Sequence, residues 1–361
     1  MGSKIRVGVI GLGMGSNHAR DYKASPNAEL VAICDIDPAR LKARAAEFAP
    51  VHAYADYKEM IRKERLDAVS VAVPNFLHCP LTCYALNHGL NVLCEKPMAM
   101  NAREAMKMRD LAKRKRLKLM IHFNYRWTQE AQALKRIVDE GILGKVYWGH
   151  TRWLRTRGFP GNGTWFTVKS RSGGGPLIDL GVHRTDLALW LMGYPEVSSV
   201  TAATYNHLAR NWPIKALIVP VGATAGGKIV VKKGADVEDL ASAFIRFKNG
   251  STLTLEASWD LNGERFEDQL TEIYGTKGGI VHRNVGEGYV YEARAYKEIG
   301  GRMATIVPKI YGGGSSAVGH FVDCVANNKA PEASADNGVY VMKILDAIYE
   351  SAKLGREVKV K

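Results

Sequence analysis

The chain has 361 residues, which exceeds the usual length of one domain and predicts two domains, each with its own apolar core. Its formal net charge of +14 is compatible with a nucleic-acid partner, but the densest basic run, residues 113–116, falls in the last turns of a predicted helix. Cations there complement the helix dipole and face water. We therefore predict no nucleic-acid partner, and the positive field would help to recruit an anionic cofactor.

The cysteines indicate a reducing compartment, and the sequence shows no pattern of a targeting or membrane segment. The five cysteines are odd in number and form no CxxC pair, which argues against a disulfide framework. The sequence shows no signal-peptide pattern, no myristoylation pattern and no run apolar enough to span a membrane. We therefore expect a cytoplasmic protein with no membrane partner.

Residues 5–123 alternate short apolar runs with helix-like stretches. Parallel strands buried on both faces are apolar throughout, and the predicted strands are 5–10, 30–34, 68–73, 92–94 and 119–123. One predicted helix begins near Leu81 and stops at Gly89, and Asn101 with Glu104 forms a capping-box pattern for the next helix. This alternation predicts an α/β fold with a Rossmann dinucleotide-binding domain over residues 1–123.

Gly11, Gly13 and Gly15 connect the first predicted strand to the first helix. Glycines allow a tight turn and a close approach to a pyrophosphate, which the exposed amides at the helix N-terminus bind. Ser16 occupies the position of the third glycine in the GxGxxG fingerprint. The strand before the loop and the helix after it nevertheless favour a dinucleotide site over a structural turn.

Asp35 ends the second predicted strand, 24 residues after Gly11. A carboxylate in this place accepts hydrogen bonds from the adenosine ribose and repels the 2′-phosphate of NADP. Arg40 is the nearby residue that would favour NADP, so we predict NAD and keep NADP as the less favoured alternative. The residues assigned to the cofactor are Gly11, Gly13, Met14, Gly15, Asp35, Pro74, Asn75, His78, Glu95 and Lys96.

Beyond Phe123 the pattern changes to longer strands. A helix over 130–140 ends at Gly141, and strands follow over 146–154, 243–247 and 252–258, the last two joined by Asn249-Gly250. We predict a C-terminal α+β domain over 124–335 with a large, mostly antiparallel open sheet. An amphipathic helix over 338–353, in a final segment 336–361, is expected to pack back on the body. The glycine-rich stretches 222–227 and 312–314 are predicted to be loops.

A lysine, a carboxylate and an imidazole are expected behind the nucleotide fold. Lys96 follows a short strand in Glu95-Lys96-Pro97, and a helix predicted to start at Pro176 and stop at Gly193 places Asp179 and His183 on one face. The carboxylate would orient the imidazole and raise its basicity, which suits removal of a hydroxyl proton near neutral pH. Lys96 would bind the same oxygen. Each feature alone is also typical of a loop end or a helix-surface pair.

Together these segments resemble the Gfo/Idh/MocA family of glucose-fructose oxidoreductases and inositol dehydrogenases. The resemblance covers nearly the full length and rests on Gly11 to His18, Asp35, Glu95-Lys96-Pro97, Asn124-Tyr125-Arg126, Gly173 to Asp186 and the helical tail after Ser334. The glycine loop is one residue shorter than the commonest form of the family. The resemblance implies a Rossmann domain, then an α/β domain whose open sheet faces the substrate or a partner subunit, commonly in homodimers or homotetramers.

The resemblance also implies roles for single residues. Lys96, Asp179 and His183 would form a catalytic set like that of inositol dehydrogenases. His183 would take the proton of a secondary alcohol as hydride passes to nicotinamide C4. Asp179 would position the substrate or the histidine, and Lys96 would anchor the reacting oxygen.

Aromatic and basic residues of the second domain are candidates for a sugar site, because sugar rings stack on aromatic faces and hydroxyls accept hydrogen bonds from guanidinium groups. The substrate-binding candidates are Lys96, Arg126, Trp153, Arg155, Trp165, Asp179 and His183, with Arg157 in the same segment. The tryptophans fit core packing equally well, and the arginines fit a surface or an interface. His150 and His320 are expected to be structural. No cluster shows metal-ligand spacing, so no metal is predicted.

Three functions remain open at this stage. The first is an NAD-dependent dehydrogenase for a secondary hydroxyl of a sugar, a glycoside such as a glucoside at C3, or a cyclic polyol such as inositol. The second is a redox-neutral glycoside hydrolase or lyase that retains its NAD, as some members of the family do. The third is a non-catalytic NAD-binding regulator, against which the joint presence of Lys96, Asp179 and His183 argues.

Overall fold

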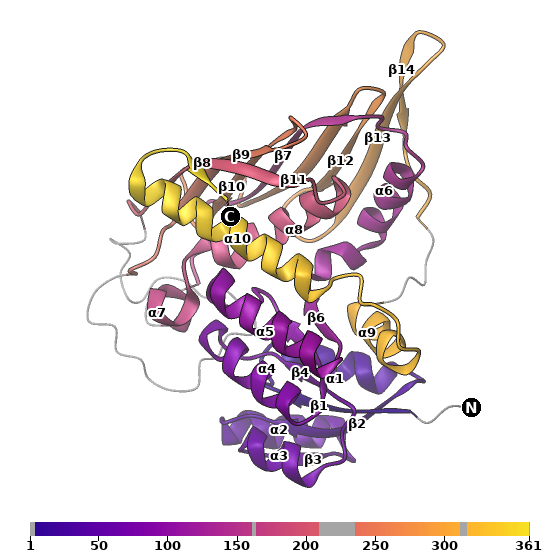
Figure 1. Cartoon of the computed structure of the whole chain (residues 1–361), viewed down its shortest axis with the longest axis vertical. Helices are drawn as coiled ribbons and strands as arrows, with labels where there is room; N and C mark the ends of the chain where they lie inside the picture. The colour runs from indigo at the N-terminus through magenta and orange to yellow at the C-terminus, as the bar shows by residue number, and fades with distance from the viewer. Residues whose placement is uncertain (1–3, 161–163, 209–234, 311–315, 361) are drawn as a thin grey trace.

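Two sheets with a layer of helices between them organise the chain (Figure 1). The computed structural model describes residues 4–160, 164–208, 235–310 and 316–360. The predicted glycine-rich loops over 222–227 and 312–314 lie outside these residues. The α/β class and the two-part architecture predicted from the sequence are confirmed.

The first sheet has six parallel strands in the order β3-β2-β1-β4-β5-β6, which is a Rossmann arrangement. Its strands are β1 (Ile5–Ile10), β2 (Ala28–Cys34), β3 (His52–Tyr54), β4 (Ala68–Val71), β5 (Asn91–Glu95) and β6 (Leu119–His122). The helices between them are α1 (Gly15–Ala24), α2 (Pro38–Phe48), α3 (Tyr57–Lys63), α4 (His78–Asn87) and α5 (Ala102–Lys115). The sequence does not predict β3, because its three residues form no apolar run.

Local signals set the helix ends of this domain. Asn101 accepts a hydrogen bond from the Glu104 amide and so caps α5 as predicted, whereas the Glu104 carboxylate accepts from Met100 N instead of closing the capping box on Asn101. Gly89 ends the α4 region with φ +82°. The helix α4 begins at His78, three residues before the predicted start at Leu81.

The second sheet has nine strands in the order β14-β13-β12-β11-β7-β10-β9-β8-β15 and is antiparallel except for the pair β7 and β10. Its strands are β7 (Val146–Arg155), β8 (Val197–Tyr205), β9 (Leu240–Phe247), β10 (Thr252–Ser258), β11 (Glu267–Gly275), β12 (Gly278–Asn284), β13 (Tyr291–Ile299), β14 (Arg302–Ile306) and β15 (Val358–Lys359). The predicted hairpin of residues 243–258 is β9 and β10.

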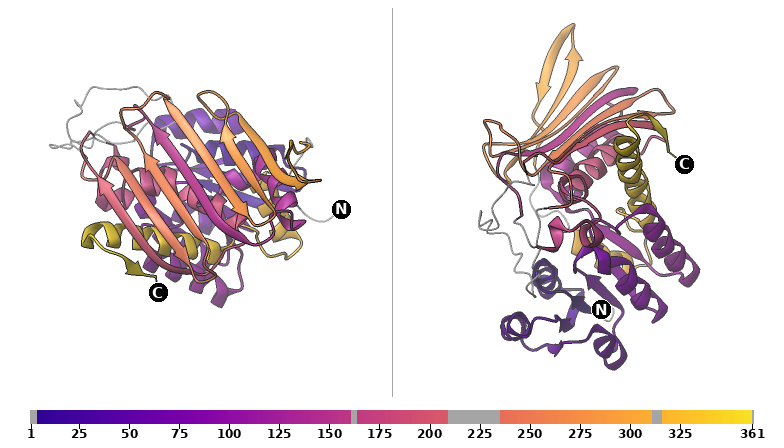
Figure 2. Two further views of the ribbon diagram at one scale, coloured as in Figure 1. Left: turned by 90° about the horizontal axis from the view of Figure 1, so that it is seen from above. Right: turned by 90° about the vertical axis from the view of Figure 1, so that its left-hand side faces the viewer.

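In the described part of the chain, helices cover the inner face of this second sheet. They are α6 (Gln129–Asp139), α8 (Val182–Leu191) and α10 (Ala335–Leu354). The short α7 (Lys169–Ser172) lies between α6 and α8 in the chain. The helix predicted from Pro176 begins with a π turn over Leu177–Gly181 before α8 continues it. The other face carries no helix among the described residues and is open in the view from above (Figure 2).

The last part of the chain returns to the first domain. The helix α9 (Ala317–Ala326) contacts α1, β1 and β5, and α10 packs against both α5 and β8. Ile121 N also donates to Ala333 O across the boundary. The predicted division at residue 335 therefore differs from the packing, because α9 lies before it and covers the Rossmann domain.

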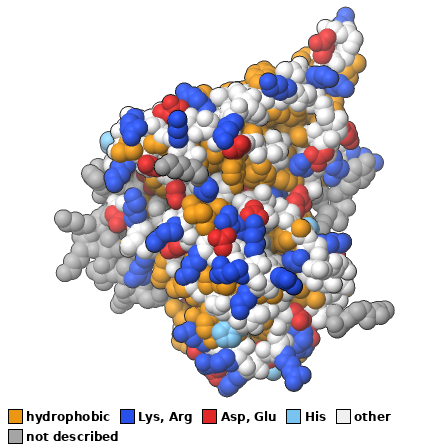
Figure 3. All heavy atoms as spheres, in the orientation of Figure 1, with side chains coloured by type: hydrophobic (Ala, Val, Ile, Leu, Met, Phe, Trp, Pro, Cys, Tyr) orange, Lys and Arg blue, Asp and Glu red, His pale blue; other side chains and the backbone are white. Residues whose placement is uncertain are grey.

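The surface shows how the positive charge is distributed. Lys and Arg side chains lie among Asp and Glu side chains over both domains on the face drawn in Figure 3. The run at the end of α5 includes Lys113, which pairs with Asp336 of α10. No helix within the described residues combines the length and hydropathy that crossing a bilayer requires.

Candidate active site

The glycine loop forms a cradle at the carboxyl end of β1. Gly11 has φ +86°, and a Cβ there would lie 2.2 Å from Ala72 O. A Cβ on Gly15 would lie 2.9 Å from Val9 Cγ1, so this glycine allows α1 to pack closely on the sheet. That is the role of the third glycine in the fingerprint, performed one residue earlier than Ser16. The shortened spacing thus keeps the tight turn of the first position and the close helix packing of the third.

The start of α1 lies beside the glycine loop. Met14, the N-cap, makes no side-chain hydrogen bond, and the first turn contains no acidic residue. The amides of Ser16 and Asn17 donate to Gly13 O and Met14 O, so a pyrophosphate would be attracted here by the positive end of the helix dipole. The loop and the helix start fit the diphosphate of a dinucleotide.

Asp35 lies at the next strand end and faces the same cradle. Its carboxylate accepts hydrogen bonds from Leu12 N at 2.7 Å and Asp37 N at 2.8 Å, and its side chain is buried. The guanidinium of Arg40 is 3.1 Å from it. Ile36, beside it, is 81% exposed, which leaves an apolar surface where an adenine ring would lie. The edge of the site therefore offers a carboxylate and an apolar contact to the adenosine.

Two of the predicted cofactor residues are engaged within the protein. Asn75 donates to Ser172 O at 2.7 Å. The His78 ring lies 2.7 Å from Pro97 O and 2.8 Å from Val73 O, and it is almost fully buried. Both side chains therefore connect loops around the site, including the loop that carries Lys96. Their hydrogen bonds do not indicate direct contact with a cofactor. Pro74 precedes this short turn.

Glu95 is the centre of a buried polar cluster. His18 Nε2 and His122 Nδ1 lie 3.0 and 2.9 Å from Glu95 Oε1, and Lys96 N donates to Glu95 Oε2. Burial raises the pKa of Glu95, but the charge and hydrogen bond of His122 and the bond of His18 outweigh it, so the pKa lies well below its usual range. The three side chains have the composition of a metal site. Because each has a hydrogen-bond partner already, we interpret the cluster as the support of the Lys96 loop.

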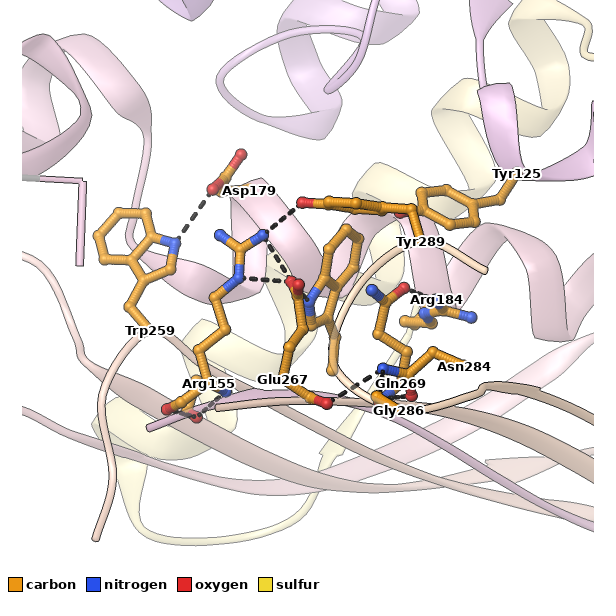
Figure 4. A network of polar contacts seen from close by, with 12 residues as sticks. Tyr125, Arg155, Asp179, Arg184, Trp259, Glu267, Gln269, Asn284, Gly286 and Tyr289 are labelled. Carbon is orange, nitrogen blue, oxygen red and sulfur yellow. Dashed lines mark hydrogen bonds and ion pairs between the residues drawn. The ribbon is translucent and has the colours of Figure 1, made fainter. Parts of the chain in front are cut away.

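Lys96 and Asp179 meet across the two domains. Lys96 Nζ donates to Asp179 Oδ1 at 2.9 Å and to Asp179 O at 2.8 Å. Trp259 Nε1 donates to Asp179 Oδ2 at 3.0 Å (Figure 4). Burial raises the pKa of Asp179, but the charges of Lys96 and Arg155 outweigh it and hold the pKa below its usual range. Asp179 is therefore an anion that is oriented by a lysine and an indole.

His183 lies next to this pair but is not bonded to it. Its Nδ1 is buried without a hydrogen-bond partner. Burial first, and then the charge of Lys96, lower the pKa of His183 well below 6.5. The expectation that Asp179 orients the imidazole and raises its basicity is therefore wrong for this state of the protein. The imidazole is neutral near pH 7 and can accept a proton.

The glycine run before Asp179 is explained by close packing. A Cβ on Gly175 would lie 2.1 Å from Glu238 O. The Glu238 carboxylate accepts hydrogen bonds from Gly175 N and Leu177 N, and Tyr349 of α10 donates to it at 2.8 Å. A buried carboxylate thus caps the π turn that carries Asp179 and fixes its position.

Aromatic rings form a wall around His183. The rings of Tyr125 and Trp153 have centroids 4.9 and 5.7 Å from that of His183. Trp153 is almost fully buried, and its Nε1 donates to Glu267 at 2.8 Å. Trp153 was expected either to pack in the core or to contact the substrate, and its burial supports core packing. Its ring packs directly against His183, the candidate base.

Arg155 and Glu267 stand beside Asp179 (Figure 4). Arg155 Nε donates to Glu267 Oε1 at 2.8 Å, and Arg155 Nη2 donates to Tyr289 OH at 2.9 Å. Tyr289 lies on the loop between β12 and β13, to which the sequence patterns assigned no role. Arg155 thus presents a positioned cation to the site.

The remaining candidates have other partners. Arg126 is fully buried, forms a bidentate pair with Asp186 and donates to Glu332 O, so its assignment to the substrate is wrong: its partners are all internal. Arg157 pairs with Asp260, and Trp165 stacks on Phe166 at 3.9 Å. The structural roles expected for two histidines agree with their contacts: His150 lies between Glu256 and Glu272, and His320 accepts from Glu332 N.

Sequence reasoning missed Trp259, Tyr125, Glu267 and Tyr289. Trp259 follows directly after the predicted strand 252–258, and Tyr125 lies inside the Asn124-Tyr125-Arg126 segment. Their positions in the sequence were signals that could have led to both residues. Glu267 and Tyr289 reach the site only through the pairing of β11 with β7 and the turn after β12, which no local pattern reveals.

Comparison with known proteins now identifies the family. Residues 5–123 match the model of an oxidoreductase family with an NAD-binding Rossmann fold, and residues 131–281 match the GFO/IDH/MocA C-terminal domain. The chain belongs to the Gfo/Idh/MocA oxidoreductase family. The resemblance drawn from the sequence is thereby confirmed, and the Rossmann domain is an NAD-binding one.

Several relatives are similar over the whole chain. D-glucoside 3-dehydrogenase of Escherichia coli (strain K12) is 31% identical over 99% of this chain and 98% of its own length. Myo-inositol 2-dehydrogenase of Thermotoga maritima is 27% identical over 99% of this chain and 98% of its own. A levoglucosan dehydrogenase in complex with NADH and levoglucosan superposes with a TM-score of 0.84, at 26% identity, over 99% of this chain and all of that one. The chain is therefore an NAD-dependent oxidoreductase of a sugar and polyol dehydrogenase family.

Proposed function

We propose that the chain oxidises a secondary ring hydroxyl of an uncharged sugar, glycoside or cyclic polyol, with His183 as the general base. The observation that supports this most directly is the convergence of Lys96, Asp179 and a neutral imidazole at the carboxyl edge of the NAD-binding sheet. Bound NAD supplies the hydride acceptor. The D-glucoside 3-dehydrogenase and myo-inositol 2-dehydrogenase relatives act on secondary ring hydroxyls by their names, which favours the same class here.

Lys96, His183 and Asp179 would have separate roles in removing the hydroxyl proton. Lys96 Nζ donates to the substrate oxygen and stabilises the negative charge that develops on it. The neutral His183 accepts the hydroxyl proton, while the carbinol C–H bond breaks and its electron pair leaves with the hydride. Asp179, held by Lys96 and Trp259, orients the ammonium group and accepts from a neighbouring hydroxyl of the substrate. The product is the ketone and the proton stays on the imidazole.

The charges near the base favour an uncharged substrate. Lys96 pairs with Asp179, and Arg155 pairs with Glu267 at 2.7 Å. Arg184 is a further cation nearby, but it is fully buried behind the ring of Tyr125. A phosphate or carboxylate on the substrate would therefore meet no free cation among the described residues of the site.

A redox-neutral glycoside hydrolase or lyase is the alternative, because the same oxidation would begin its cycle. Purified protein should be incubated with excess NAD and a panel of inositols, free sugars, glucosides, glucuronides and sugar phosphates, with NADH absorbance and aglycone release followed separately. We expect NADH from a neutral substrate and no aglycone. Aglycone release without net NADH would support the alternative, NADH from charged members alone would contradict the proposed substrate class, and bound NAD without either reaction would support a regulator.

We further propose that the open face of the nine-stranded sheet joins copies of the chain into a homodimer or homotetramer, in a cytoplasmic setting. The outer face lacks a helix cover among the described residues, and the β13–β14 hairpin beside it exposes Ile299 and Met303. The five cysteines are all free and buried, as a reducing compartment requires. Light scattering after size-exclusion chromatography should give a multiple of the chain mass. A monomer at micromolar concentration would contradict the assembly.

A further inference from the structure

A cavity of about 370 Å³ lies where β12 ends and β13 begins. Its charged lining residues are Arg265, Arg283, Glu292 and Arg294. Arg283 is exposed between two buried neighbours of β12, so its side chain projects from the face of the sheet that the helices do not cover. The volume is at the lower end of the range for small-molecule sites.

Two arginines of the cavity share one carboxylate. Arg283 Nε and Arg294 Nη2 both donate to Glu292, the second at 2.9 Å. Within the described chain, neither guanidinium has another hydrogen-bond or ion-pair partner. A guanidinium has five N–H groups, so each keeps donors for a ligand. The two side chains are 50% and 42% exposed, which leaves them accessible.

The third arginine of the cavity also has a shared carboxylate. Arg265 Nη1 donates to Asp268 Oδ1 at 3.1 Å, and Arg152 Nε donates to Asp268 Oδ2 at 2.8 Å. Together with the two arginines that bind Glu292, four guanidinium groups share two carboxylates. An excess of two positive charges therefore remains around the cavity.

The edge of the cavity is held by internal hydrogen bonds. Arg265 Nη2 donates to Gly286 O at 2.6 Å. Asn284 Nδ2 donates to the same oxygen at 3.1 Å and to Glu267 O at 3.0 Å (Figure 4). Glu287, on the adjoining loop, accepts from Phe266 N and does not line the cavity. The cationic groups are thus positioned before a ligand arrives, which lowers the entropy cost of binding.

We propose that this cavity is a second ligand site, which binds the phosphate group of inorganic phosphate or of a small phosphate monoester. Guanidinium groups bind phosphate oxygens through charge-assisted, paired hydrogen bonds, and a dianion matches the excess of two positive charges. The lining includes none of Lys96, Asp179 and His183. The inference therefore holds whatever the substrate of the active site proves to be.

Isothermal titration calorimetry with inorganic phosphate and with glycerol phosphate, on protein saturated with NADH, tests the proposal. Bound NADH occupies the glycine loop, where a free phosphate would otherwise compete. We expect dissociation constants of about 1 mM or lower for at least one of the two ligands, and no binding of potassium chloride at the same ionic strength. Tighter binding of glycerol phosphate would identify a monoester as the ligand, and equal binding would identify the phosphate group alone.

Variants of the lining locate the binding. Arg283→Gln together with Arg294→Gln should weaken phosphate at least about 10-fold, since charge-assisted donors are lost. Glu292→Gln should tighten it by about threefold or more, because the competing carboxylate is removed. The matched control is Arg246→Gln, at an exposed arginine of β9 paired with Glu357, which should change the dissociation constant by less than about twofold.

The gain in Glu292→Gln keeps the test decisive if the double arginine variant does not fold. The proposal is overturned if the wild-type protein binds neither phosphate nor glycerol phosphate, or if Glu292→Gln binds no more tightly than wild type. An acidic side chain of a second copy is the competing occupant. In that case the double arginine variant would dissociate on size-exclusion chromatography while the wild type bound no phosphate.

Discussion

Replacing His183 by alanine should lower kcat by about 10²- to 10⁴-fold, because proton removal would lose its positioned base. The imidazole lies against Tyr125 and Trp153 of the second domain, so NADH binding should stay within about threefold of the wild type. Steady-state turnover and NADH titration on the same preparation check both statements. A variant that keeps a third of the wild-type rate would remove His183 from the mechanism.

The matched control is His52→Ala. His52 is an exposed histidine of β3, on the far edge of the Rossmann sheet, and pairs with Glu64. Its loss should leave kcat within about twofold, as expected for an exposed side chain at the edge of the sheet. If both variants lost activity equally, the cause would be a general fall in stability rather than a missing base, and a thermal unfolding curve of each protein would show it.

The pH profile follows from the low pKa of His183. The base works only when neutral, and burial and the charge of Lys96 place its pKa well below 6.5. The acid limb of kcat/KM should therefore lie below 6.5 in the wild-type enzyme. Stability should also fall at low pH. As the pH drops through about 6.5, His183 binds a proton in the unfolded chain but not in the native protein, so the free energy of unfolding decreases.

The Rossmann half of the site was readable because its signals are local. Buried parallel strands are apolar along their whole length, and the glycine loop and Asp35 each follow one of them. Even the irregular spacing had a local meaning, since Gly15 rather than Ser16 meets Val9 at the helix–strand contact. The preference for NAD was predicted from Asp35, but the ion pair between Asp35 and Arg40 is visible only in the structure.

The chemical half depends on contacts between distant segments. A spacing of four residues suggested that Asp179 and His183 share one helical face, but the π turn from Leu177 to Gly181 changes the angle between them. Asp179 instead pairs with Lys96, 83 residues away, and with Trp259, 80 residues away. Arg126 likewise lies in a recognisable motif, yet a buried pair with Asp186 uses its guanidinium. The residue types of the chemical site could be predicted from the sequence, but the residues that each one contacts could not.

Lys96→Met should lower kcat/KM by about 10²- to 10³-fold, the effect of removing one donor to a developing oxyanion. It should also move the acid limb of the profile to higher pH. The Lys96 charge is the second-largest cause, after burial, of the low pKa of His183, and its removal makes the imidazole easier to protonate. A residue that merely supported the fold would change the rate without moving this limb.

Lys96→Arg separates charge from position. Arginine keeps a cation near His183, so the acid limb should stay low. Its planar fork cannot reproduce the contacts of one Nζ atom to both Asp179 oxygens and the substrate, so the rate should remain well below wild type. Lys113→Met, which removes an exposed lysine of α5 paired with Asp336, should affect neither quantity by more than about twofold. An acid limb that stays fixed in Lys96→Met, or a kcat/KM within threefold of wild type, would show that the lysine sets neither the basicity of His183 nor the stability of the oxyanion.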